Sequence, residues 1–233
     1  MKLNRFASRV NEFLEFQRSL CDIERTKRAQ LIRMKPITLD GHSLTIPDLY
    51  SIAIHRAPVK VAPKAIREIG RSRNLVKQWV ANDQTVYGVT TGFGEFASTK
   101  ISAPDIGQLQ LNLIRSHSVG AGDPLPPEIV RAMMALRVNA LAKGFSGIRM
   151  QTVELLVAML NKNIVPVIPS QGSVGASGDL VQLSHLVLAM IGEGRVWFNG
   201  KAIPSAKALA AHRLKPARLE DRKSTRLNSS HRL

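Results

Sequence analysis

Cysteine is nearly absent from this chain of 233 residues, which carries only Cys21. A single cysteine can form neither an internal disulfide nor a cysteine-based metal cluster. The six histidines also lack a close His-x-x-His or His-Glu pairing, so we expect no bound metal. The chain has no apolar run long enough to cross a bilayer, and its first residues lack the apolar core of a secretory signal. We therefore expect no membrane partner and a location in the cytoplasm.

Acidic residues are scarce too, since 17 Asp and Glu stand against 33 Lys and Arg. The resulting net charge of +16 raises the possibility of a basic nucleic-acid-binding module, which a steep salt dependence of DNA binding would reveal. Half of this charge, however, lies in residues 1–33 and 215–233. Aromatic residues make up only 5% of the chain and do not alternate with the basic ones. The basic residues of the middle region therefore indicate solvated helix faces, and we expect no nucleic-acid partner.

The middle of the chain has the apolar periodicity and the start signals of a mainly α protein with a few short strands. Helices are predicted over about 102–118, 126–143, 149–162 and 179–191. The second of these carries the apolar residues Ile129, Met133, Leu136, Val138 and Leu141. Near the end of the chain, Asn199-Gly200 lies between two short apolar runs and predicts a hairpin with a type I′ turn.

The chemistry is suggested by residues 172–179, which read Gly-Ser-Val-Gly-Ala-Ser-Gly-Asp. Glycine lacks a Cβ, so the nitrogen of Gly178 can approach the carbonyl carbon of Ala176. Ring closure and loss of two waters would convert Ser177 into the exocyclic methylene of a methylidene-imidazolone, an electrophile that no ordinary side chain supplies. The simpler interpretation of these residues alone is a turn in which Ser177 or Asp179 caps a helix.

Four segments in a fixed order carry a family resemblance: residues 87–94, 109–122, 143–149 and 172–185. Through them the chain resembles the aromatic amino acid ammonia-lyases, which include histidine, phenylalanine and tyrosine ammonia-lyases and related aminomutases. The resemblance covers roughly residues 35–220. It implies the N-terminal part of an ammonia-lyase-type helical fold, ending before most of the central helix bundle. It also implies that Ala176, Ser177 and Gly178 form the methylidene-imidazolone autocatalytically, with no metal or diffusible cofactor.

The resemblance also implies the roles of other residues. Tyr87 matches the catalytic tyrosine that removes the substrate's β-proton, and Gly94 closes a glycine-rich loop that folds over the substrate. Ser116 and His117 match the pair beside the substrate side chain, in the form found in histidine lyases. An imidazole both donates to and accepts from another imidazole, which favours L-histidine as the substrate and urocanate and ammonia as the products. Tyrosine or phenylalanine as the substrate, and an aminomutase outcome, remain alternatives.

The tripeptide would lie just before the predicted helix 179–191, whose N-terminus favours negative charge. Within that helix, His185 is expected to be a buried structural histidine. Val181-Gln182 stands where the family more often carries Ala-Pro or Thr-Pro.

Domain organisation is predicted in three parts. Residues 1–33 resemble a non-native extension, residues 34–220 form the lyase domain, and residues 221–233 resemble translated vector sequence. The resemblance implies a longer lyase that assembles as a homotetramer and whose later half supplies further site residues, so we expect this chain to be a fragment that is inactive by itself. A non-catalytic helical interaction protein is the alternative of another class. Formation of the ring, measured by mass spectrometry, separates the two.

Overall fold

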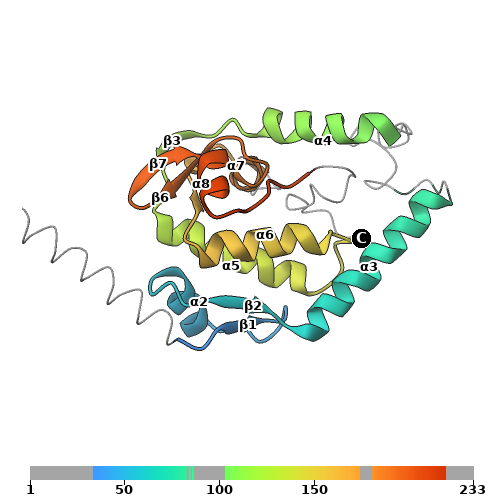
Figure 1. The fold of residues 1–233 in the computed structure, drawn as a ribbon, viewed down its shortest axis with the longest axis horizontal. Helices are drawn as coiled ribbons and strands as arrows, with labels where there is room; N and C mark the ends of the chain where they lie inside the picture. Colours follow the sequence, from blue (N-terminus) through green and yellow to red (C-terminus); the bar gives the residue numbers. More distant parts are fainter. Residues whose placement is uncertain (1–33, 83, 85, 87–102, 174–179, 219–233) are drawn as a thin grey trace, which may run out of the picture. The chain divides into compact units, whose positions relative to one another are not determined.

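The computed structural model describes residues 34–82, 84, 86, 103–173 and 180–218 (Figure 1). Residues 1–36 and residues 37–233 form two separate units, and every element described below belongs to the second. The helices are α2 (Ile46–Ala53), α3 (Pro63–Ala81), α4 (Ala103–His117), α5 (Pro127–Ala142), α6 (Met150–Asn161), α7 (Leu180–Met190) and α8 (Ser205–Ala211). The predicted mainly α class is therefore confirmed. The predicted boundaries at residues 33 and 220 fall at the edges of the described region, so that division stays a prediction.

The strands are short and lie in three small sheets. They are β1 (Ile37–Leu39), β2 (Val59–Val61), β3 (Ala121–Pro124), β4 (Val165–Pro166), β5 (Pro169–Gln171), β6 (Arg195–Phe198) and β7 (Lys201–Pro204). β1 and β2 pair in parallel, β3 and β5 pair antiparallel, and the third sheet has the order β4-β6-β7. Between β6 and β7, Asn199 has φ 50° and Gly200 has φ 74°, which fits the positive angles that a type I′ turn requires. The predicted hairpin is confirmed.

Helix α5 contributes a large part of the core, because α2 and α6 both pack on it. Its buried apolar residues are Val130, Met134, Ala135, Val138, Leu141 and Ala142. Two of the apolar residues expected on this helix, Ile129 and Leu136, are 53% and 49% exposed. At 100° per residue these two lie on the opposite side of the helix from Val138. The helix thus carries apolar residues on two faces, and periodicity alone does not reveal which face becomes covered.

A buried cation ties these helices together. The Arg131 guanidinium donates to the carbonyl oxygens of Ile52 and Ala53 at the end of α2, with Nη2 2.8 Å from the Ile52 oxygen. Its Nη1 donates to the Leu160 carbonyl near the end of α6, at 3.0 Å. The last carbonyl groups of a helix have no hydrogen-bond donor within the helix and carry partial negative charge. A guanidinium at this position supplies both the donors and the opposite charge. We call α2, α5 and α6 the frame.

The second packed region brings α4 against α7. Ile114 of α4 is fully buried, as are Leu186 and Val187 of α7. The four predicted helices 102–118, 126–143, 149–162 and 179–191 correspond to α4, α5, α6 and α7 and begin and end within two residues of the predicted bounds. This second region holds the described part of the candidate site.

Candidate functional site

The structure describes some of the predicted site residues and not others. Ser116 and His117 lie in the last turn of α4. Tyr87, Gly94 and the tripeptide of residues 176–178 lie outside the described residues. Their predicted roles therefore stay predictions. What the structure does describe is the chain on both sides of residues 174–179, together with the end of α4.

The last turn of α4 fixes the His117 ring. Its Nδ1 lies 2.8 Å from the Leu113 carbonyl oxygen and 3.2 Å from the Ser116 Oγ. A carbonyl oxygen can only accept a hydrogen bond, so the His117 Nδ1 carries the proton. The Ser116 hydroxyl donates to the same Leu113 carbonyl oxygen at 3.0 Å. In the neutral ring, Nε2 is then an acceptor. Both side chains are anchored to the helix backbone, and the acceptor nitrogen of His117 points away from that anchor.

The chain beyond α4 is held to α7 by His185. The Gly120 N–H donates to the His185 Nε2 at 3.1 Å, and a Cβ on Gly120 would stand only 3.0 Å from that nitrogen. Partial burial lowers the pKa of His185, which favours the neutral ring that accepts this bond. His185 is half-buried rather than buried as predicted. Its expected structural role fits this contact.

Strands β3 and β5 carry the connection to the start of residues 174–179. Ala121 pairs with Gln171 and Pro124 with Pro169. Strand β5 runs directly into Gly172 and Ser173, the last described residues before position 174. Ser116 and His117 are therefore followed along the chain by Gly120 and β3. Strand β3 pairs with β5, which leads into the predicted prosthetic-group segment. We call this assembly, with the first two turns of α7, the junction.

Gly172 allows β5 to approach α7 closely. It has φ +143°, and a Cβ there would lie 2.8 Å from the Val181 Cγ1 and 3.2 Å from the Gly120 Cα. Real Cβ atoms do not make contacts as short as the first of these, and the backbone angle is one that other residues rarely adopt. A glycine at this position is therefore required for the end of β5 to reach the first turn of α7.

Ser173, which follows Gly172, makes a polar contact between the end of β5 and the first turn of α7. The Ser173 hydroxyl donates to the Gln182 Oε1, which is nine positions further along the chain. Both side chains are half-buried. Analysis of the sequence alone did not find this pair. No local signal marks it, because a serine in a strand end and a glutamine in a first helical turn are each ordinary until the intervening chain brings them together.

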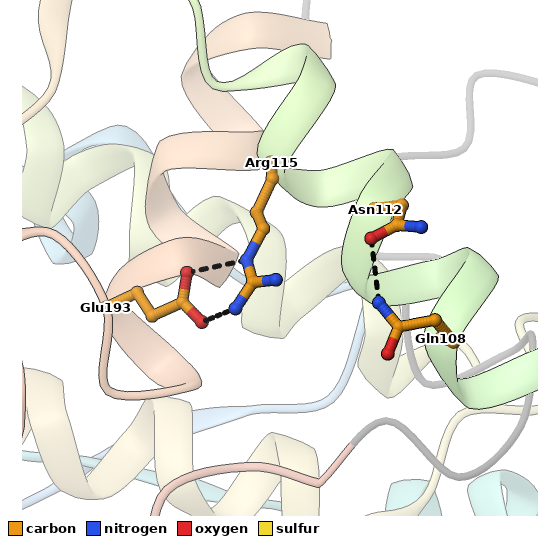
Figure 2. Close-up of polar contacts among 4 residues, drawn as sticks. All are labelled: Gln108, Asn112, Arg115 and Glu193. Atoms are coloured by element: carbon orange, nitrogen blue, oxygen red, sulfur yellow. Dashed lines mark hydrogen bonds and ion pairs between the residues drawn. The ribbon is translucent and has the colours of Figure 1, made fainter.

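An ion pair holds the last turn of α4 to the turn after α7. The Arg115 Nη2 lies 2.6 Å from the Glu193 Oε1, and the Arg115 Nε donates to the Oε2 at 3.0 Å (Figure 2). The hydrogen bond between them raises the pKa of Arg115 and lowers the pKa of Glu193, so the two directions agree. This bidentate pair, adjacent in sequence to Ser116, was also not predicted. On the same exposed face, Gln108 donates to the Asn112 oxygen at 2.8 Å (Figure 2).

Gln110 lies on the inward face of α4. Its side chain is 1% exposed, and neither its amide nitrogen nor its oxygen has a hydrogen-bond partner among the described residues. Seven residues make almost two turns, so Gln110 projects from the same side of the helix as His117. A buried carboxamide without partners is unusual in a folded protein. It adds a donor and an acceptor to the face that carries the predicted substrate-binding histidine.

Within the described part of the chain, no group of three or more His, Cys, Asp or Glu side chains is arranged to hold a metal ion. None of the described helices is long and apolar enough to span a membrane. The polar groups on this side of α4 are the imidazole of His117, the hydroxyl of Ser116 and the buried carboxamide of Gln110.

Comparison with known proteins gives a consistent result. The profile described as aromatic amino acid lyase matches residues 44–231. The chain is 51% identical over 176 residues to histidine ammonia-lyase of Caldanaerobacter subterraneus, covering 76% of this chain and 35% of that protein. It is 46% identical over 191 residues to histidine ammonia-lyase of Geobacillus thermodenitrificans, covering 82% and 38%. The chain thus spans little more than a third of the length of these curated relatives.

Solved structures with a similar fold include a histidine ammonia-lyase, an ergothionase and a tyrosine aminomutase. The crystal structure of histidine ammonia-lyase from Trypanosoma cruzi matches with a TM-score of 0.77 and 41% identity, covering 83% of this chain and 38% of that one. Ergothionase from Treponema denticola matches with a TM-score of 0.79 and 33% identity, covering 84% and 39%. Tyrosine aminomutase from Streptomyces globisporus matches with a TM-score of 0.76 and 36% identity, covering 83% and 36%.

Proposed function

Since this chain belongs to the aromatic amino acid lyase family, we propose that it is part of an ammonia-lyase that converts L-histidine to urocanate and ammonia. The relatives named histidine ammonia-lyase support this substrate, as does the histidine-type pair at Ser116 and His117. The geometric observation that carries the proposal is the junction. There, an imidazole with a fixed tautomer is joined through Gly120 and β3 to the strand that enters residues 174–179.

The prosthetic group is assigned to Ala176, Ser177 and Gly178. The Gly178 nitrogen would form a bond to the Ala176 carbonyl carbon, and the Ala176 oxygen would leave as water with the amide hydrogens of Gly178 and Ser177. Ser177 loses its Cα proton and its hydroxyl as a second water. The described flanks fit such a bend, because Gly172 meets Val181 and Ser173 meets Gln182, so both ends of the segment start from one place. The resulting methylidene-imidazolone supplies an electrophilic methylene for the departing amine.

Substrate recognition is assigned to the end of α4. The His117 Nε2, as the acceptor of the neutral ring, would receive a hydrogen bond from the substrate imidazole N–H. Ser116 shares the anchor at the Leu113 carbonyl and so helps to fix the ring plane of His117. Such a contact rejects a substrate side chain that has no N–H to donate, because a polar group of the site would then lose its partner. This is the physical basis for preferring histidine over phenylalanine.

Proton removal is assigned to Tyr87, with Gly94 in the loop that covers the substrate. The free phenol titrates at a pH of about 10, so the site must stabilise the phenolate for it to act as a base near neutral pH. Charge pushed onto the ring formed directly before α7 would be stabilised by the N-terminus of that helix. Homotetrameric assembly and a cytoplasmic location belong to this proposal as well, on the basis of the family resemblance.

The test is an assay of the polypeptide translated from the uninterrupted reading frame that contains this chain. We expect ammonia and urocanate from L-histidine, and a loss of about fivefold or more in kcat/KM for histidine in His117→Leu, as one lost hydrogen bond to substrate implies. The exposed His42 gives the matched control, and His42→Leu is expected to leave kcat/KM unchanged. Absence of ammonia release from histidine would refute the proposal.

The aminomutase alternative is compatible with the fold. The fold matches the tyrosine aminomutase structure about as well as the histidine ammonia-lyase structure, so the fold does not separate the two reactions. Product analysis separates them. A β-amino acid formed from tyrosine, with no urocanate from histidine, would establish the aminomutase and overturn the lyase.

A further inference from the structure

Ser116 and His117 lie in the last turn of α4. The last turn of a helix frays more readily than its middle, because its final carbonyl groups have no amide donor within the helix. The Leu113 carbonyl oxygen is the acceptor that anchors both side chains of the pair to this turn. The pair keeps its arrangement only while the turn stays closed, so whatever holds the turn closed also positions the pair.

Two contacts attach the chain on either side of this pair to α7 and to the turn that follows α7. Directly before the pair, Arg115 makes the bidentate ion pair with Glu193 (Figure 2). Shortly after the pair, the Gly120 N–H donates to the His185 Nε2 at 3.1 Å. The pair therefore lies between two attachments to one part of the fold, and these attachments oppose the fraying of the last turn of α4.

The His185 contact resists water and salt better than the ion pair does. The Arg115 and Glu193 side chains are 50% and 38% exposed, so water and salt weaken their attraction. The Gly120–His185 contact is half-buried and uncharged, which makes its hydrogen bond harder for water to replace. Gly120 also fits tightly, because a Cβ there would lie 3.0 Å from both the His185 Nε2 and the Pro169 Cβ. The segment that follows the pair is thus fixed mainly by His185.

We propose that His185 is a positioning residue that holds the last turn of α4 closed through Gly120, and so fixes Ser116 and His117 for their contact with the substrate. The proposal rests on the proposed function for this pair, and it adds a residue outside the pair on which substrate binding depends. His185 does not touch the substrate in this scheme. Its effect is on the fraction of molecules in which the pair is arranged to bind.

The experiment changes this contact from both sides in the full chain. His185→Leu removes the acceptor, and His185→Gln keeps one. Gly120→Ala adds a Cβ that must displace the segment from His185 or from Pro169, and it tests the same contact if His185→Leu does not fold. Matched controls are His42→Leu, at an exposed position, and Gly70→Ala in α3, where a Cβ would meet no atom within 4 Å.

The first measurement is hydrogen exchange of the His117 and Ser118 amides, followed by NMR at one pH above the value of about 6.5 at which histidine titrates. We expect both amides to exchange at least about fivefold faster in His185→Leu and in Gly120→Ala than in wild type, the effect of one net hydrogen bond. His185→Gln and both controls should keep the wild-type rate. The double variant should exchange no faster than the faster single variant, because both changes break the same contact. Wild-type exchange in His185→Leu and Gly120→Ala would overturn the proposal.

Two comparisons separate this effect from other causes. Exchange at His117 should accelerate relative to exchange at Met134, a buried residue of α5, because the change is local. If the two amides accelerate equally, the variant has lost overall stability and the positioning role is refuted. Glu193→Gln weakens the ion pair and should accelerate exchange at His117 less than His185→Leu does. An equal or larger effect of Glu193→Gln would show that the ion pair, and not His185, holds the turn.

The second measurement is the histidine assay described under the proposed function. When fewer molecules have the pair arranged to bind, the apparent affinity falls while the chemistry after binding is unchanged. We expect the KM for L-histidine to rise in His185→Leu by up to about fivefold, with kcat changed by less than about twofold, and His185→Gln to restore the KM. An unchanged KM in His185→Leu despite faster exchange would refute the link to substrate binding. If wild type releases no ammonia, the proposed function fails, and the exchange rates still decide whether His185 holds the turn.

Discussion

The frame and the junction satisfy their buried polar groups in different ways. In the frame, the 3% exposed Arg131 finds its partners in carbonyl oxygens of the described residues, at the ends of α2 and α6. On α4, two turns before the junction, the 1% exposed Gln110 has no partner among the described residues, and at the junction the His117 Nδ1 is bonded to the Leu113 carbonyl oxygen. Polar groups of the frame stabilise packing. The Gln110 carboxamide, by contrast, is buried without a partner among the described residues.

The two regions also differ in how they secure helix ends. Arg131 reaches the carbonyls of two helices from a buried position, where a lost hydrogen bond leaves unsatisfied groups behind. Arg115 secures the last turn of α4 to Glu193 from the surface, with side chains 50% and 38% exposed. Water and salt compete with the second arrangement and not with the first. The three predictions that follow test this contrast, in order of decreasing effect.

Removing the buried cation should give the largest change. Arg131→Met leaves the carbonyls of Ile52, Ala53 and Leu160 without this donor, and we expect a loss of about 3–5 kcal/mol in the free energy of unfolding. Urea unfolding followed by circular dichroism measures it. The exposed Arg67 on α3 supplies the matched control, since Arg67→Met should change the free energy by no more than about 0.5 kcal/mol. A midpoint for Arg131→Met equal to that of the control would show that the frame does not depend on this residue.

A smaller effect is expected at His185, where it depends on pH. Partial burial lowers the pKa of His185 in the folded chain, so the unfolded chain binds more protons between the two pKa values. The contribution of the neutral ring is therefore present above the unfolded pKa of about 6.5 and is lost as the pH falls through the folded value. His185→Gln keeps an acceptor for the Gly120 N–H and does not titrate.

The measurement is the free energy of unfolding of wild type and His185→Gln between pH 8 and pH 5, taken as a difference. We expect wild type to lose stability relative to the variant on acidification below a pH of about 6.5. A difference that is constant over this range, or that grows in favour of wild type at low pH, would show that His185 is not held in its neutral form by the junction.

The ion pair between Arg115 and Glu193 should give the smallest effect. Both side chains are partly exposed, so their coupling in a double-mutant cycle should be small at low salt and should shrink further in high salt. The neutral pair Gln108–Asn112 on the same face of α4 is the control, because its coupling should not respond to salt. If the coupling of Arg115 with Glu193 is as large in high salt as in low salt, the pair behaves like the buried contacts of the frame.

Local signals account for the parts of the fold that could be predicted. Pro127 begins α5 at the first helical position, and Asn199-Gly200 adopts the positive φ angles of a type I′ turn, because each depends on the backbone of one or two residues. The covered face of α5 could not be predicted. Ile129 and Val130 are neighbours of nearly equal hydrophobicity, yet one is 53% exposed and the other fully buried. Which face is covered depends on where α2 and α6 pack, and no short window contains that information.

The candidate site divides in the same way. The sequence motif alone was enough to propose Ser116 and His117 as substrate-binding residues, because a family motif specifies which residue types occur at the site. The Ser173–Gln182 bond and the Gly120–His185 bond could not be predicted, since their partners are 9 and 65 positions apart. Glycine at position 172 was visible in the sequence, but its close approach to Val181 was not.

The amino-acid sequence by itself determined the helices, the hairpin turn and the family, because these depend on local backbone preferences and on side chains that occur in recognisable order. Only the tertiary structure decided which face of α5 is covered, that Arg131 joins the ends of two helices, and that Gln182 meets Ser173. These contacts join residues distant along the chain. Their existence depends on the packing of whole helices and strands, which brings donors to acceptors at distances of a few ångströms.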